Sequence, residues 1–113
     1  MARKTNPFRG EWRIVSTDVW DDLDDLGPAY LTFGRGRTGE LQLMVITASV
    51  DYRLVTRDDS LIAEFSWAGD DDGSPISGRG WARRTANGLI GSLLIHEGDE
   101  SGFVAKRPPK SRR

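Results

Sequence analysis

Residues 77–96 read SGRGWARRTANGLIGSLLIH, and this stretch decides the fold because it predicts a β-hairpin. Asn87-Gly88 lies between two runs that contain apolar residues. Both central residues of a type I′ turn need a positive φ, which Asn and Gly tolerate best. With these two residues as the loop, Ala86 faces Leu89, and pairing continues outward one residue at a time on each strand. The hairpin therefore has a predictable register.

The two faces of this hairpin differ in composition, because directly opposed residues lie on the same face of a sheet. One face sets small residues against large ones in most of its pairs, which are Ala86–Leu89, Arg84–Gly91, Ala82–Leu93, Gly80–Ile95 and Gly78–Glu97. The other face carries Thr85–Ile90, Arg83–Ser92, Trp81–Leu94 and Arg79–His96. If this second face points into a barrel, Arg79, Trp81 and His96 line the interior. If it points outward, they form a solvated ladder in which the stem of Arg79 covers Trp81.

The rest of the chain predicts further short strands. Alternating apolar and polar residues mark strands at residues 10–16, 29–33, 40–47, 49–56, 61–67 and 103–107, and no strong turn separates the third from the fourth. With the hairpin this predicts an all-β fold of seven or eight antiparallel strands. An up-and-down barrel is the simplest arrangement that removes both edges of such a sheet. We expect a barrel domain at residues 9–107, between an N-terminal tail at 1–8 and a basic C-terminal tail at 108–113.

Two acidic stretches interrupt the strands. In residues 17–26, Val19, Leu23 and Leu26 recur at helical spacing and predict a short helix over one end of the barrel. Its aspartates form a solvated face or, alternatively, a docking helix for a basic partner. Residues 70–73 read DDDG, but the glycine position and the missing glutamate do not fit an EF-hand, so Asp72-Gly73 is predicted to be a hairpin turn.

Composition excludes several classes of site and partner. The 113 residues include one histidine and no cysteine, which excludes disulfides, a cysteine nucleophile and a thiolate site, so we expect no metal and no cofactor. All 17 acidic residues lie within 8–104, whereas lysine is confined to the two ends. An acidic body with basic ends argues against nucleic acid as a partner. Neither a signal peptide nor a membrane span is apparent, which predicts a cytoplasmic protein with no membrane partner.

The opening of the first strand, Gly10-Glu11-Trp12, resembles the Gly-x-Trp motif of the lipocalin and wider calycin barrels. That resemblance implies a meander of strands around a ligand cavity. It also implies that a basic residue of the last strand, Arg107 or Lys106, packs over Trp12 and closes the barrel through a cation–π contact. From GEWRIV through EFSW and SGRGW to IHEGD, the chain also resembles a group of small bacterial proteins without an assigned function, which implies a coherent domain and no particular activity.

Catalysis has little support in the sequence. A serine triad needs a histidine that is oriented by a carboxylate, but the predicted register places Arg79 opposite His96. An arginine there disfavours the protonated imidazole, so we expect a neutral, hydrogen-bonding histidine. Glu64 and Asp51 are the strand carboxylates that could serve acid–base chemistry, but nothing places them near each other. An enzyme that uses Glu64 or His96 is therefore the third hypothesis for function.

The first hypothesis is non-enzymatic binding of a small anionic or carbonyl-bearing molecule inside the barrel. Its expected lining is aromatic with a few polar groups, namely Arg79, Trp81, His96, Arg53, Glu64 and Trp67. The second hypothesis is a filled barrel that acts as a protein-interaction module through the acidic helix around Trp20 and the basic tail. A cavity lined by Arg79 and His96 would favour the first hypothesis, and a packed interior with Trp20 exposed beside Leu23 would favour the second.

Overall fold

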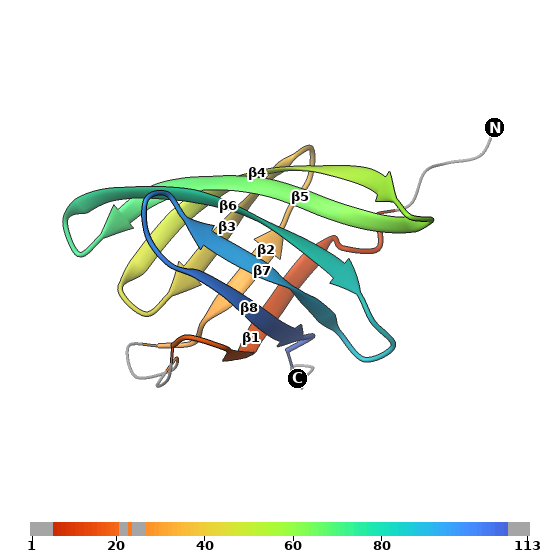
Figure 1. The fold of residues 1–113 in the computed structure, drawn as a ribbon, viewed down its shortest axis with the longest axis horizontal. Helices are drawn as coiled ribbons and strands as arrows, with labels where there is room; N and C mark the ends of the chain where they lie inside the picture. Colours follow the sequence, from red (N-terminus) through yellow and green to blue (C-terminus); the bar gives the residue numbers. More distant parts are fainter. Residues whose placement is uncertain (1–5, 21–22, 24–26, 109–113) are drawn as a thin grey trace, which may run out of the picture.

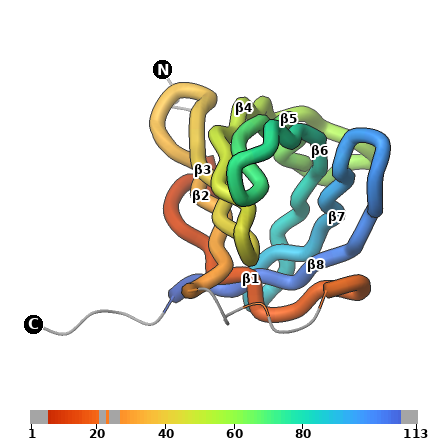
Figure 2. Tube along the Cα trace, turned by 90° about the vertical axis from the view of Figure 1, so that its left-hand side faces the viewer, coloured from red at the N-terminus to blue at the C-terminus, as the bar shows by residue number. Residues whose placement is uncertain are grey.

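The chain folds into a closed antiparallel barrel (Figure 1). The computed structural model describes residues 6–20, 23 and 27–108. Each strand pairs with the next, and the last pairs with the first, so that the strands follow one another around the barrel (Figure 2). This confirms the predicted all-β barrel. The strands are β1 (Gly10–Thr17), β2 (Tyr30–Phe33), β3 (Thr38–Leu43), β4 (Ile46–Arg57), β5 (Ser60–Asp71), β6 (Ser74–Arg84), β7 (Leu89–Ile95) and β8 (Glu100–Lys106).

Half of the residues of the predicted helix at 17–26 lie outside the described residues. Thr17 is the last residue of β1, and 21–22 and 24–26 are not described. None of the described residues is helical. Among them there is accordingly no helix that is long and apolar enough to cross a membrane.

Four of the described hairpin turns place residues with side chains at positive φ, and two of them bear on the predicted turns. Asp72-Gly73 joins β5 to β6 with φ values of 52° and 96°, as the sequence predicts. The break between β3 and β4 falls at residues 44–45, inside the stretch predicted as one strand at 40–47, and Met44 has a φ of 55°. The sequence pattern misses this turn because Met lacks the signature of Gly or Asn at such a position. The two expected strands are therefore separate strands with an earlier boundary.

The hairpin of β6 and β7 has a longer loop than predicted. Arg84 faces Leu89, so the loop consists of the four residues 85–88. The prediction of a two-residue turn at Asn87-Gly88, and the register derived from it, was therefore wrong. The backbone N–H of Thr85 donates to the carbonyl of Gly88 at 2.8 Å, and the Thr85 hydroxyl accepts from the Gly88 N–H at 3.0 Å. The observed pairing differs from the predicted one by two positions. Because side chains alternate with a period of two, each residue still lies on its predicted face.

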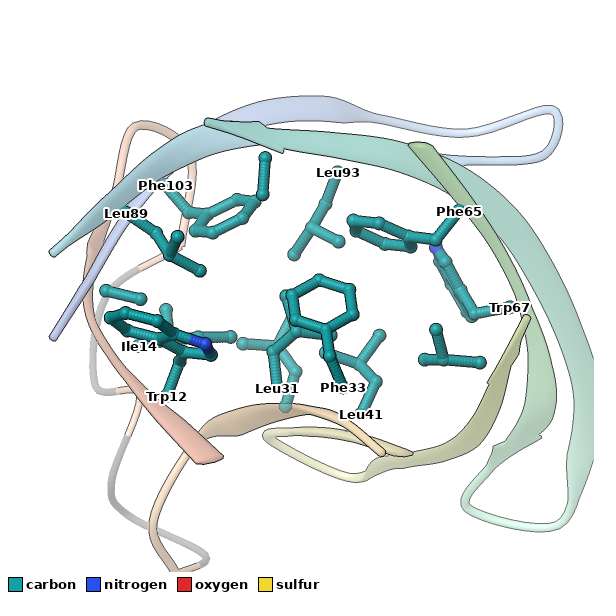
Figure 3. Close-up of a cluster of buried hydrophobic side chains, with 14 of the residues drawn as sticks. Trp12, Ile14, Leu31, Phe33, Leu41, Phe65, Trp67, Leu89, Leu93 and Phe103 are labelled. Carbon is teal, nitrogen blue, oxygen red and sulfur yellow. The ribbon is translucent and has the colours of Figure 1, made fainter. Parts of the chain in front are cut away.

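The interior of the barrel is filled by apolar side chains (Figure 3). Phe33 lies at the centre of an aromatic cluster, with ring centroids 6.0 Å from Phe8, 4.8 Å from Tyr52 and 5.9 Å from Phe65, all in edge-to-face geometry. Such contacts contribute about 0.5–1.5 kcal/mol each beyond the burial of apolar area. Phe8, which the sequence assigns to the N-terminal tail, is fully buried because its ring packs against this cluster.

Two glycines of β6 make room for two aromatic residues of β5. Gly78 is paired with Trp67, and Gly80 with Phe65. A Cβ atom at Gly78 would lie 2.7 Å from Trp67 Cζ2, and one at Gly80 would lie 2.7 Å from Phe65 Cζ. The aromatic rings therefore occupy the space above the β6 backbone, and the small residues of the hairpin face inward for this reason.

A buried serine on β8 holds the segment that follows β1. Ser101 is 2% exposed, and its hydroxyl accepts hydrogen bonds from the backbone N–H groups of Asp18 and Val19 at 3.0 and 3.1 Å. The adjoining side chains of Trp20 and Leu23 are partly buried against the core. This segment is thus tied to the barrel.

Replacement of Gly80 by alanine should destabilise the protein by about 1–3 kcal/mol, because the added methyl group would clash with the backbone carbonyl of Ser92 on β7 and with the ring of Phe65. Urea denaturation measures the change in the free energy of unfolding. Ser77→Ala is the matched control, since Ser77 lies on the same strand with an exposed side chain. Equal stability of the two variants would contradict the packing described for β5 and β6.

Candidate functional site

The second face of the β6–β7 hairpin points outward. Ala82, Leu89 and Leu93 on the first face are at most 1% exposed. The alternation of strand side chains then places Arg79, Trp81 and His96 outside. Trp81 is 39% exposed and the His96 side chain 72%, so the expectation that these residues line the interior is not met.

A hollow on this outer face has a volume of about 510 Å³ and spans β4 to β8. Two cross-strand rows of side chains form it. The first row is Arg53, Glu64, Trp81 and Ser92, and the second is Asp51, Ser66, Arg79, Leu94 and Glu100. We call these nine residues the outer groove.

A second hollow of about 410 Å³ adjoins the outer groove. It shares Glu64 and Trp81 with the groove, and it adds Arg57, Ile62 and Arg83 among its lining residues. Trp81 therefore stands between two depressions of one surface. A flat molecule on its ring could extend into either of them.

Charged residues of the groove differ in whether they have partners. The Glu64 carboxylate accepts a hydrogen bond from Arg57 Nε at 2.7 Å and also contacts Arg57 Nη2. The Ser92 hydroxyl donates to Glu100 Oε2 at 3.3 Å. Within the described ranges, neither Arg53 nor Arg79 has a side-chain hydrogen bond or an ion pair. Among the residues described, the groove thus presents two arginines without a side-chain partner, together with the carboxylates of Asp51 and Glu100.

The structure brings together four of the six candidate residues, namely Arg53, Glu64, Arg79 and Trp81. Trp67 instead lies inside the barrel, 3% exposed. Its indole Nε1 has no hydrogen-bond partner among the described residues. Trp67 belongs to the apolar face that the sequence assigns to β5, and it therefore packs into the core rather than the groove.

His96 lies away from the groove. Its backbone N–H donates to the carbonyl of Ser77 at 2.8 Å, so Ser77, and not Arg79, is its neighbour across the hairpin. Its Nε2 lies 3.9 Å from the exposed carboxylate of Glu97. His96 and Glu64 line different hollows and do not form one acid–base pair. No cluster of three or more His, Cys, Asp or Glu suitable for a metal ion occurs in the part of the chain that is described.

Sequence reasoning missed Arg57, Ser92 and Glu100 as members of this surface. A signal for part of it exists, because the predicted strands at 49–56 and 61–67 are consecutive, and pairing them from residues 56 and 61 outward places Arg53 opposite Glu64, as observed. Ser92 and Glu100 could not be found in this way, because their place beside Trp81 and Arg79 depends on the shifted register of β6 and β7.

A second group of cations covers a buried tryptophan at another place on the barrel. Trp12 is fully buried, and its Nε1 donates to the carbonyl of Phe8 at 2.7 Å. The guanidinium carbon of Arg107 lies 3.7 Å from the centroid of the Trp12 ring, and that of Arg84 lies 5.1 Å from it. Lys106, the other basic residue considered for this position, is exposed and pairs with Arg13 in the sheet.

Comparison with protein-family models, curated proteins and solved structures finds no match for this chain. The function is therefore argued from the residues themselves.

Substitution of Trp81 by alanine should lower the free energy of unfolding by about 1 kcal/mol or less, because the side chain lies on the surface. Trp67→Ala should lower it by about 3–5 kcal/mol, because a buried ring is lost from the core. Urea denaturation of the two variants compares them directly. A larger loss for Trp81→Ala would show that the hairpin faces are reversed.

Proposed function

We propose that the protein binds a small anionic or carbonyl-bearing molecule with a flat apolar part, that it performs no reaction on it, and that the ligand lies in the outer groove. The observation that carries the proposal is the exposed ring of Trp81 beside Arg53 and Arg79, which lack partners within the described ranges. The flat part would stack on the indole. A carboxylate or phosphate would accept paired hydrogen bonds from a guanidinium, the geometry for which arginine is best suited.

The spacing of the two arginines agrees with a ligand of this size. Arg53 lies on β4 and Arg79 on β6, with β5 between them. Neighbouring strands lie about 4.8 Å apart and Arg79 is offset by two residues from the row of Arg53, so these two positions are roughly 12 Å apart on the sheet. A molecule of one or two rings with an acidic group can bridge that distance within a groove of about 510 Å³.

Binding without catalysis is favoured by the state of Glu64 and His96, two of the three candidate acid–base groups; the third, Asp51, lines the outer groove together with Glu64. The carboxylate of Glu64 is engaged by Arg57, and His96 lines a different hollow. A general base must lie within hydrogen-bond reach of the proton that it removes. A ligand in the outer groove would not have both Glu64 and His96 within reach.

We also propose a relationship to the lipocalin and calycin barrels. It is supported by the closed meander of eight strands and by the place of Arg107 over Trp12. In those families the ligand lies in the barrel cavity, whereas apolar side chains fill this interior. The resemblance therefore supports a relationship between the folds only. The proposed position of the ligand is supported by the residues of the outer groove.

A protein-interaction module is the second candidate function, and the filled interior favours it. However, Trp20 and Leu23, which were expected to form its docking surface, are partly buried against the core, which leaves Val19 as the exposed apolar side chain of that segment among the residues described. The outer groove therefore ranks first.

Native mass spectrometry of freshly purified protein is the first test of the proposal. A bound small-molecule mass that is lost on denaturation, and that is absent from Arg79→Gln, would support the groove. A protein complex in place of a small molecule would favour the interaction module.

The groove residues should each contribute to the binding of anilinonaphthalenesulfonate, a flat aromatic anion. We expect Arg53→Gln and Arg79→Gln to weaken its binding about tenfold or more, because each removes a charged hydrogen-bond donor. Trp81→Ala should weaken it by a similar factor. Fluorescence titration gives the dissociation constants.

Arg35→Gln is the matched control for this titration, because Arg35 is exposed in the turn between β2 and β3 and lines neither hollow. Circular dichroism checks that every variant is folded. Unchanged affinity in all three groove variants would refute the proposed site.

A further inference from the structure

Two arginines from separate strands meet over the same buried ring. Arg84 ends β6, and Arg107 follows β8. Both guanidinium groups lie close to Trp12, at 5.1 and 3.7 Å from the ring centroid. Trp12 itself is fully buried, whereas both arginines are exposed to solvent on their other side. The result is a pair of cations on the surface above an aromatic floor.

Backbone carbonyls hold both arginines in place. Arg84 Nη1 donates to the carbonyl of Pro7 at 2.7 Å, and Arg107 Nη1 donates to the carbonyl of Glu11 at 3.3 Å. A guanidinium has five N–H donors in a planar fork. Each arginine therefore retains several donors after these bonds are made.

Gly10 is required for the position of Arg107. A Cβ atom at residue 10 would lie 2.5 Å from Arg107 Nη1, and the φ of +114° is one that residues with side chains rarely adopt. The chain thus places a residue without a side chain where the second guanidinium lies.

The charges of this pair are not balanced. In the described ranges, no carboxylate oxygen lies within 4.0 Å of either guanidinium, as an ion pair would require. Burial lowers the pKa of Arg107, and the neighbouring charge of Arg84 lowers it further. Two cations held together repel each other, and an oxyanion between or beside them would remove that repulsion.

We propose that Arg84 and Arg107 form an anion-binding site for a phosphate group, separate from the outer groove. A phosphate carries up to two negative charges and several acceptor oxygens, which match two guanidinium forks better than a halide does. The group could be inorganic phosphate or the terminal group of a phosphate monoester. The free donors of both arginines would bind its oxygens, and the ring of Trp12 would keep the guanidinium groups in place from below.

Isothermal titration calorimetry with inorganic phosphate, at a constant ionic strength set with sodium chloride, tests the site. The wild-type protein should bind one phosphate, and Arg84→Gln should weaken the binding about tenfold or more. Arg84→Lys should retain more of the affinity than Arg84→Gln, because it keeps the charge but loses the fork. Methyl phosphate, which has no flat apolar part to stack on Trp81, distinguishes the two sources in a parallel titration, since tighter binding of the ester would assign the site to a monoester.

Arg35→Gln is the control, because Arg35 is exposed in the turn between β2 and β3, lines neither hollow and should leave phosphate binding unchanged. Arg107→Gln removes the other guanidinium and should weaken phosphate binding as well. If this variant does not fold, Arg84→Gln still decides the result, since Arg84 lies farther from the Trp12 ring. Equal phosphate affinity in wild type and Arg84→Gln, or no binding by the wild type, would overturn the proposal. Neither result would affect the outer groove, which is measured with a different ligand.

Discussion

The structure depends on the division of β1 between two neighbours. Its first half, Gly10 to Arg13, pairs with β2, and its second half, Arg13 to Thr17, pairs with β8. A bulge lies between Ile14 and Ser16, where the register shifts by one residue. Bulges increase the local twist and bend a strand. This bend allows one strand to satisfy both edges of the sheet, and without it β2 and β8 would be open edges with exposed backbone groups.

Closure of the sheet determines where function can lie. Once the sheet is closed, inward positions are shielded from water and favour apolar side chains, and the aromatic cluster around Phe33 shows how fully this interior is used. The polar and charged residues of the same strands must then lie on the outside. A barrel with a filled interior leaves its outer face and its ends for recognition, which is why both proposed sites are found there.

Much of the fold could be predicted from the sequence, because it follows from local rules. The alternation of side chains predicts the strands and assigns each hairpin residue to its face, and the Asp72-Gly73 turn follows from backbone preferences. The register of β6 and β7 could not be predicted, because a hydrogen bond of the Thr85 hydroxyl closes a longer loop. Which face of the hairpin points outward depends on the curvature of the whole sheet, so the sequence could not show that the candidate site lies outside the barrel. Four of the candidate residues nevertheless lie together on one surface. The pairing of Glu64 with Arg57 depends on side-chain conformations that no pattern encodes.

Along each strand, side chains that line the outer groove alternate with side chains that fill the core. Positions such as 53, 79 and 81 lie between residues that carry the core, yet they point away from it. Selection can therefore act on the two sets almost independently, in the way that the variable loops of an antibody change on a constant framework. A library that randomises the outer rows alone would explore new specificities on a scaffold whose folding it scarcely alters.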